Sequence, residues 1–302
     1  MPRLKISSEV QEALDSGQPV VGLESTIYSH LGLPSPANQE ALDRSTNAIR
    51  THGAVPAITA ILDGVPCIGL EESEHERILG PARKTAERDI AIAIAQKWPV
   101  GATTVSASLA LCAAAGISVF ATGGIGGVHL GSELTADISG DLGAIALHPV
   151  LTVCAGAKAF LDIPKTVEFL ETEAVTVLAY QTDEFPMFYA RSSGVKAPNR
   201  VDTPAAVAAI LAQRIVWDQG GVLLAVPVPE ADAIPTREIQ NAIDTALARA
   251  RNIHGAAITP FVLEQIAKIT EGRSIPANLA LAENNAAVAA QVAVELSHMS
   301  AQ

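Results

Sequence analysis

The run Leu151-Thr-Val-Cys-Ala-Gly-Ala-Lys158-Ala-Phe-Leu-Asp-Ile163 decides how this chain is interpreted. Its first four residues predict a buried strand, Ala-Gly predicts a turn, and Lys158 then stands alone among apolar residues. Ligands of α/β proteins bind at the carboxyl ends of strands. Desolvation disfavours the ammonium form of lysine, and the neutral amine is a nucleophile toward carbonyl carbon. The run therefore predicts a reactive lysine; the alternative is a lysine whose stem is buried while its head reaches solvent.

Outward from this run, strand-like and helix-like segments alternate along the chain. Thr203-Pro204 begins a helix to about 218, because Thr caps a helix and proline suits its first turn. Asp63-Gly64 between two apolar runs predicts a hairpin. The remaining predicted strands are 18–25, 117–122, 151–154, 174–180 and 222–229, and the remaining predicted helices are 8–16, 37–52, 85–97, 106–115, 164–172, 235–252, 260–269 and 276–298. This alternation predicts an α/β fold, with a mostly parallel central sheet, helices on both faces, and a single domain over 1–302.

Composition limits the kind of protein. Hydrophobic residues make up 49% of the 302 residues but aromatic residues only 4%, so the core is aliphatic. The net charge of −12 argues against a nucleic-acid or anionic-membrane surface. Cys67, Cys112 and Cys154 are far apart and odd in number, which predicts reduced core residues of a cytoplasmic protein. The first residues lack the apolar stretch of a signal peptide, and no run of membrane length is free of polar breaks.

Two glycine-containing polar breaks follow predicted strands: Gly101-Ala-Thr-Thr-Val105, and Ala121-Thr-Gly-Gly-Ile-Gly-Gly-Val-His129. Glycine lets a backbone turn its N–H groups toward an anion without a Cβ clash. The second break is neither GxGxxG nor a Walker A loop, so it indicates no dinucleotide or nucleoside triphosphate. The plain alternative is a tight turn.

Three acidic residues are candidates for chemistry. Asp137 and Asp141 are four residues apart, on one face if helical, and carboxylates suit a hard cation such as Mg²⁺ or Mn²⁺. A helix N-terminus also favours acids, which is the alternative. Glu24 ends the first long strand, where a carboxyl group acts as a general acid or base or simply as a cap.

Lys84 and three asparagines complete the candidates. Lys84 lies in a small basic cluster at the predicted start of helix 85–97, one of few places where this acidic chain meets a phosphate, unless the cluster is a solvated face. Asn278, Asn284 and Asn285 lie in the last predicted helix, where asparagine costs helix propensity. That cost predicts ligand binding, and the alternative is a helix surface beside a subunit contact.

Taken together, these segments resemble the pseudouridine-5′-phosphate glycosidase family. The matching motifs occur in order over nearly the whole chain, and the pair FATGGIGGVH (120–129) and CAGAK (154–158) is the most specific. The others are VGLESTI, GAVPAITAILDG, Lys84 with Arg88-Asp89, GATTVSAS, DISGDL, VEFLET, DEFPMFYARSSG, GGVLLAVPVPE, ITPFVLEQI and ANLALAENNA.

The resemblance implies a site and an assembly. It implies that Lys158 is the nucleophile, Glu24 the proton donor and Asp137 the Mn²⁺ ligand. The family forms homotrimers with an α/β/α core, and it makes or breaks the C–C bond between ribose C1′ and uracil C5. The expected substrate contacts are Lys84, Thr104, Val105, His129, Ser139, Gly140, Asp141 and Asn285.

The chemistry of a C–C glycosidic bond agrees with a lysine nucleophile. No leaving-group oxygen is available to protonate, so the two-carboxylate route of ordinary glycosidases expels a poor carbanion. A lysine instead attacks C1′ and opens the ribose ring. A carboxyl group protonates the base carbon, and the remaining imine hydrolyses to ribose 5-phosphate.

The sequence also departs from the family pattern. Leu31 is an insertion, Glu87 and Leu130 stand where basic residues are usual, and Gly140 replaces alanine. These changes predict a less polar rim and poor handling of pseudouridine 5′-phosphate. They leave two acceptors open: uracil, or an aromatic polyketide aglycone as in the C-glycosynthase branch of alnumycin biosynthesis. A non-catalytic sugar-phosphate binding protein is the alternative from another class, and a ribokinase-like phosphotransferase is disfavoured because no nucleotide motif is present.

Overall fold

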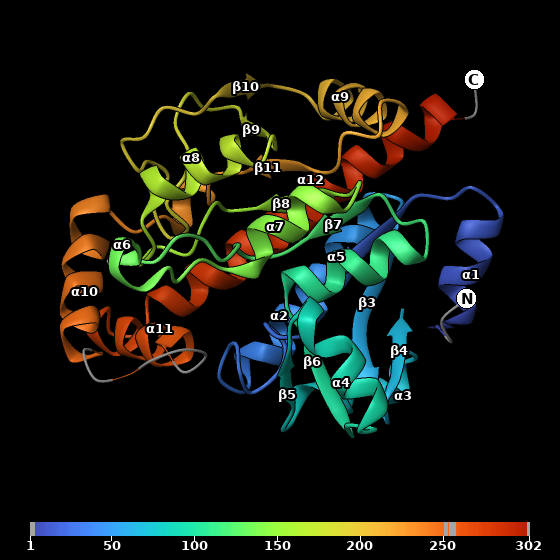
Figure 1. Ribbon diagram of the computed structural model, residues 1–302, viewed down its shortest axis with the longest axis horizontal. Helices are drawn as coiled ribbons and strands as arrows, with labels where there is room; N and C mark the ends of the chain where they lie inside the picture. The colour runs from blue at the N-terminus through green and yellow to red at the C-terminus, as the bar shows by residue number, and fades with distance from the viewer. Residues whose placement is uncertain (1–3, 251–252, 254–257, 301–302) are drawn as a thin grey trace.

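The computed structural model describes residues 4–250, 253 and 258–300, and it is built around a mixed sheet (Figure 1). The strand order is β1-β4-β3-β2-β7-β8-β11-β9-β10, with β6 pairing β3 and β5. All pairs are parallel except β3 with β4 and β3 with β6, which confirms the mostly parallel sheet. The strands are β1 Lys5–Ile6, β2 Val20–Leu23, β3 Val55–Leu62, β4 Val65–Ile68, β5 Arg83–Thr85, β6 Val100–Thr103, β7 Val119–Ala121, β8 Leu151–Cys154, β9 Thr176–Tyr180, β10 Asn199–Val201 and β11 Val222–Ala225.

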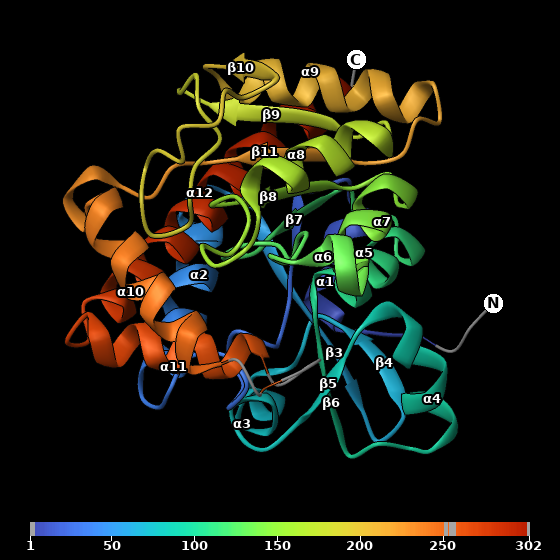
Figure 2. The same ribbon diagram turned by 60° about the vertical axis from the view of Figure 1, so that its left-hand side comes forward.

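Helices cover both faces of this sheet, as predicted (Figure 2). One apolar core lies between the sheet and α2, α9 and α12, and the other lies between the sheet and α1, α5, α7 and α8. Central strands such as β8 are buried along their whole length, which explains their continuous apolar sequences. The helices are α1 Ser8–Asp15, α2 Ala37–Thr51, α3 Glu72–Leu79, α4 Ile90–Ala95, α5 Val105–Ala114, α6 Ser132–Thr135, α7 Gly140–Leu147, α8 Ile163–Thr172, α9 Pro204–Val216, α10 Thr236–Arg249, α11 Ile258–Ile269 and α12 Ser274–Ser300.

The hairpin and most of the predicted helices are confirmed. Asp63 and Gly64 both have positive φ angles, +52° and +74°, which is what a tight two-residue hairpin requires. The predicted helix 85–97 is wrong at its start: β5 is followed by a 3₁₀ turn, Glu87–Asp89, and only then by α4. Its first residue, Thr85, belongs to β5, which forms because β6 offers a parallel partner that local periodicity does not reveal. In the predicted helix 235–252, α10 ends at Arg249, and 251–252 lie outside the described residues.

The order of the strands creates a switch point in the middle of the sheet. β2 pairs with β3 on one side and with β7 on the other, and the chain continues outward in both directions. Ligands bind at the carboxyl ends of strands at such points. Among the described helices, none has a stretch long and apolar enough to cross a membrane.

Candidate active site

The register of β2 and β7 places two polar side chains next to each other at the switch point. Leu23 is paired with Ala121, so the residues that follow them, Glu24 and Thr122, leave the sheet side by side. Both are buried, with 8% and 5% of their surface exposed. The Thr122 hydroxyl donates a hydrogen bond to Glu24 Oε1. Sequence reasoning identified Glu24 but missed Thr122, although its place directly after a strand was a usable signal.

Burial controls the protonation of Glu24. Desolvation raises the pKa of this carboxyl group, and it outweighs the opposing effects of the Lys158 charge and the Thr122 hydrogen bond. A carboxyl group in this setting keeps its proton to a higher pH than an exposed glutamate does. Glu24 therefore has the protonation behaviour that a general acid needs.

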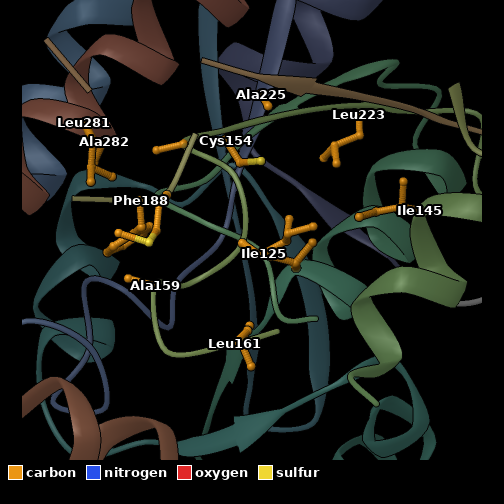
Figure 3. Packing of buried hydrophobic residues seen from close by; sticks show 14 of the residues in the cluster. Ile125, Ile145, Cys154, Ala159, Leu161, Phe188, Leu223, Ala225, Leu281 and Ala282 are labelled. Atoms are coloured by element: carbon orange, nitrogen blue, oxygen red, sulfur yellow. The ribbon is translucent and has the colours of Figure 1, made fainter. Parts of the chain in front are cut away.

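Lys158 follows β8 through a turn that only glycine can make. Gly156 has a φ angle of +86°, and a Cβ there would lie 2.4 Å from the Pro186 carbonyl oxygen. The backbone N–H of Lys158 then donates to the Ile125 carbonyl at 3.0 Å, which fixes the base of the side chain. The side chain is half-buried, and Figure 3 shows the apolar residues packed around this turn, among them Ala159, Leu161 and Phe188. The predicted apolar setting is confirmed.

The Lys158 amine is chemically available. Within the described ranges, Lys158 Nζ makes no hydrogen bond or ion pair, although its charge acts on the pKa values of Glu24, Lys84 and His129. These three groups therefore lie close enough to the amine for its charge to affect them. A lysine amine without a carboxylate partner, near a carboxyl group with a raised pKa, has the groups that nucleophilic catalysis with a proton donor requires.

Lys84 reaches this space from β5 rather than from a helix start. It pairs in register with Ala102 of β6, so it lies beside the point where β6 ends and α5 begins. Desolvation of the ammonium, and then repulsion from Lys158, lower the pKa of Lys84, although the residue as a whole is exposed. Thr104 is the N-cap residue of α5 and Val105 its first residue, and both are buried.

Asp141 joins the separate pieces of the site. Its Oδ1 accepts the Ser106 N–H at 3.1 Å, and its Oδ2 accepts the Gly126 N–H at 2.9 Å. Ser139 caps α7 by accepting the N–H of Asp141 at 3.3 Å. The first turns of α5 and α7 therefore converge on one buried carboxylate, where both helix dipoles favour negative charge.

The glycines between β7 and His129 are required for close approach. A Cβ on Gly126 would lie 2.2 Å from Ser139 Oγ, and one on Gly124 would lie 2.5 Å from the Phe188 ring. The predicted anion cradle is present at one N–H, that of Gly126, and the anion it holds is the chain's own Asp141.

Asp137 and Asp141 do not share a helical face, because α7 begins only at Gly140, after the Ser139 cap. Asp137 instead approaches His129: its Oδ2 lies 3.9 Å from His129 Nδ1, and its carbonyl accepts the His129 N–H at 3.0 Å. Burial lowers the pKa of His129, against the raising effect of Asp137. The described residues contain no group of three or more His, Cys, Asp or Glu side chains placed to share a metal. One carboxylate beside an imidazole suits a hard cation that keeps most of its waters.

The asparagines of α12 face inward. Asn285 is fully buried, and its Nδ2 donates to the Thr122 carbonyl at 2.8 Å and to the Gly123 carbonyl at 3.2 Å. Asn278 is also buried, whereas Asn284 donates to the Pro227 carbonyl at 3.5 Å. An exposed helix surface is therefore the wrong interpretation for Asn278 and Asn285.

Comparisons with known proteins fit this geometry. Residues 9–295 match the family described as indigoidine synthase A like protein. The chain belongs to this family. A pseudouridine-5′-phosphate glycosidase of Methylobacterium nodulans is 51% identical over 98% of this chain and 88% of its own, and one of Arabidopsis thaliana is 47% identical over 98% and 91%. The crystal structure of the prealnumycin C-glycosynthase AlnA in complex with ribulose 5-phosphate is 35% identical and superimposes with a TM-score of 0.91 over 99% of this chain and 98% of its own. The crystal structure of an indigoidine synthase A-like protein of Thermotoga maritima is 34% identical in sequence. It superimposes with a TM-score of 0.88 over 98% of this chain and 97% of its own.

Three of the four residues that depart from the family pattern lie in different local settings. Glu87 Oε1 lies 2.9 Å from Nε2 of His148, which follows the C-terminus of α7. The backbone N–H of Glu87 donates to Ser106 Oγ at 3.2 Å, and the Ser106 N–H bonds Asp141 Oδ1 at 3.1 Å, so Glu87 lies beside the start of α5 while its side chain bonds His148. Its assignment to the acceptor rim stays a prediction. Leu130 is 58% exposed directly after His129, and Leu31 is half-buried in the loop after Glu24.

Proposed function

We propose that this protein cleaves pseudouridine 5′-phosphate to uracil and ribose 5-phosphate through an imine on Lys158. One observation carries the proposal: the unpaired amine of Lys158, which follows β8, acts electrostatically on the buried carboxyl group of Glu24, which follows β2 and has a raised pKa. Relatives named for this activity are 46% to 51% identical to the chain, compared with 35% for the C-glycosynthase. Retention of both groups argues against a binding protein without catalysis.

The proposed steps balance with one water. The neutral Lys158 amine attacks C1′, the bond from C1′ to the ring oxygen breaks, and that oxygen takes the proton that the attacking nitrogen releases. Glu24 then protonates uracil C5, the C1′–C5 bond breaks with its electron pair going to the base, and the nitrogen lone pair forms the imine. Water hydrolyses the imine to ribose 5-phosphate and free Lys158. General acid catalysis is needed because the base carbon leaves poorly without that proton.

The phosphate is placed, in this proposal, where α5 and α7 begin. Two helix N-termini and Lys84 supply local positive potential, which the Asp141 carboxylate offsets in part, in a chain whose net charge is −12. Thr104, Val105, Ser139 and Gly140 are the residues that lie there. Asp141 of α7 bonds the first turn of α5 through Oδ1 and the loop after β7 through Oδ2, so we assign it to positioning these elements.

Asp137, with His129 beside it, is the proposed position for Mn²⁺. When bound, such a cation polarises water and orders polar groups around it. We expect wild type to bind Mn²⁺, measured by calorimetric titration, and Asp137→Asn to lose that binding. Unchanged binding in the variant would make Asp137 structural.

The remaining assignments concern the setting. The family resemblance supports a homotrimer, which light scattering tests by comparing the mass with 31.3 kDa per chain. Three buried free cysteines support a reducing, cytoplasmic location. An aromatic acceptor is the second candidate, supported by exposed Leu130 next to His129 and by the similarity to the C-glycosynthase.

The decisive experiment traps the imine during turnover. Wild type is incubated with pseudouridine 5′-phosphate, uracil release is followed, and borohydride is added before peptide mapping. We expect uracil release and a reduced ribose 5-phosphate adduct on Lys158. Lys158→Ala loses both, whereas Lys165→Ala, which removes an exposed lysine paired with Glu133, keeps both. An adduct on Lys84, or turnover by Lys158→Ala, would overturn the mechanism; coupling of ribose 5-phosphate to an aromatic ring, with no uracil release, would favour the second candidate.

A further inference from the structure

The hydrogen bond between Thr122 and Glu24 has a chemical direction. A threonine hydroxyl has one proton, and here it is donated to Glu24 Oε1. In the protonated form of Glu24, the oxygen that accepts this bond is the carbonyl oxygen of the carboxyl group. The acidic proton is then carried by the other oxygen, Oε2.

We infer that Thr122 is a positioning residue that fixes which oxygen of Glu24 carries the transferable proton and where that oxygen points. The inference rests on the proposed function, in which Glu24 protonates the leaving base. Without the Thr122 hydroxyl, the carboxyl group can rotate and place its proton on either oxygen. The fraction of molecules with a correctly aimed proton then falls.

The backbone of Thr122 is held by the neighbouring strand β8 and by the helix α12. Its N–H donates to the Val153 carbonyl of β8 at 3.0 Å, and its carbonyl accepts from Asn285 Nδ2 at 2.8 Å. Asn285 Oδ1 is buried and has no hydrogen-bond partner within the described part of the chain. A buried polar atom left unpaired costs stability. We therefore assign the role of the Asn285 amide to the two hydrogen bonds that its nitrogen donates. The helix α12 thus reaches through the core to fix the residue that orients the acid.

The charges around Glu24 determine what the bond does to its titration. Lys158 after β8, Lys84 on β5 and the Thr122 bond lower the pKa of Glu24, whereas burial and Asp141 of α7 raise it. Removing the hydroxyl takes away a lowering effect, so the pKa rises further. Since the protonated form is the active acid, the loss of activity at high pH then begins at a higher pH.

The test compares isosteric threonine-to-valine changes on neighbouring strands. Thr122→Val removes the orienting hydroxyl, and Thr122→Ser keeps it. Thr152→Val is the control, because Thr152 is fully buried on β8 and its hydroxyl has no partner among the described residues. All variants are assayed for pseudouridine 5′-phosphate cleavage across a pH range.

We expect Thr122→Val to lower kcat by roughly 10- to 100-fold, part of what a general acid contributes, with KM within about twofold of wild type. The basic limb of its pH profile moves to higher pH, and Thr122→Ser and Thr152→Val behave like wild type. Wild-type kcat and pH profile in Thr122→Val overturn the inference, as do equal losses in the serine and valine variants.

A second measurement separates this inference from the proposed function. The titration of Glu24 is followed by carboxyl ¹³C NMR, with Glu24→Gln assigning the signal. A higher pKa in Thr122→Val supports the hydrogen bond even if wild type releases no uracil, which would refute only the proposed function. An unchanged titration in an active enzyme refutes only the role of Thr122.

Discussion

At the scale of single residues, burial gives a common side chain an uncommon function. The pKa of Glu24 is raised because the side chain is buried where β2 ends, next to Thr122 and near Lys158. Lys158 has the complementary property of an amine without an anionic partner. Neither residue needs a rare sequence signal, because each can be predicted from its position shortly after the end of a strand.

Glu24→Gln keeps the size of the side chain and removes its acidic proton. We expect kcat for pseudouridine 5′-phosphate to fall by roughly 10²–10⁴-fold, because the base carbon no longer receives a proton as the bond breaks. The dissociation constant of ribose 5-phosphate, measured by calorimetry, changes little. Equal losses of affinity and turnover would instead identify Glu24 as a residue that positions the substrate.

At the scale of elements, the loop after β7 depends on glycine for contact rather than for unusual backbone angles. Gly126 lies against Ser139 and Asp141, so the loop, the cap of α7 and the first turn of α5 form one packed unit. The same loop is held from behind by Asn285 of α12.

Gly126→Ala and Gly143→Ala should have opposite effects on stability. A Cβ on Gly126 overlaps Ser139 Oγ at 2.2 Å, and the required shift costs about 1–3 kcal/mol. Gly143 lies in α7 with nothing within 4 Å of an added Cβ, so alanine there stabilises the helix by about 0.5–1 kcal/mol. Urea unfolding at one chain concentration measures both. A neutral Gly126→Ala would show that the loop can move aside without loss.

Local sequence predicted elements well where local interactions define them, and failed where pairing is distant. The Asp63-Gly64 hairpin and the Thr203 cap were readable because turn and cap chemistry is local. β5 was missed because Arg83–Thr85 becomes a strand only beside β6. The site residues Glu24 and Lys158 were found from strand ends and from the family resemblance. The pairing of Asp137 with His129, and of Glu87 with His148, depends on loop paths that no spacing rule contains.

At the scale of the whole molecule, the site depends on a sheet that contains both parallel and antiparallel strand pairs. β3 is parallel to β2 on one side and antiparallel to β4 and β6 on the other. Lys84 comes from the antiparallel side, whereas Glu24 and Lys158 come from the parallel side. A small separate core of Ile61, Ala93 and Trp98 lies under the antiparallel part.

Because β3 belongs to both parts, we expect the predicted single domain to unfold as one unit. Trp98 is 6% exposed and reports on the antiparallel part, while Trp217 is 70% exposed, so Trp217→Phe leaves one informative fluorophore at little cost. Far-UV circular dichroism reports mainly on the helices elsewhere, and activity reports on the site between the parts. At one chain concentration in urea, the three signals should share one midpoint. If the Trp98 signal changes at a lower urea concentration than the helix signal, the chain consists of two domains. Activity would then be lost in the first transition. The reason is that Lys84 would leave the site while Lys158 and Glu24 were still in place.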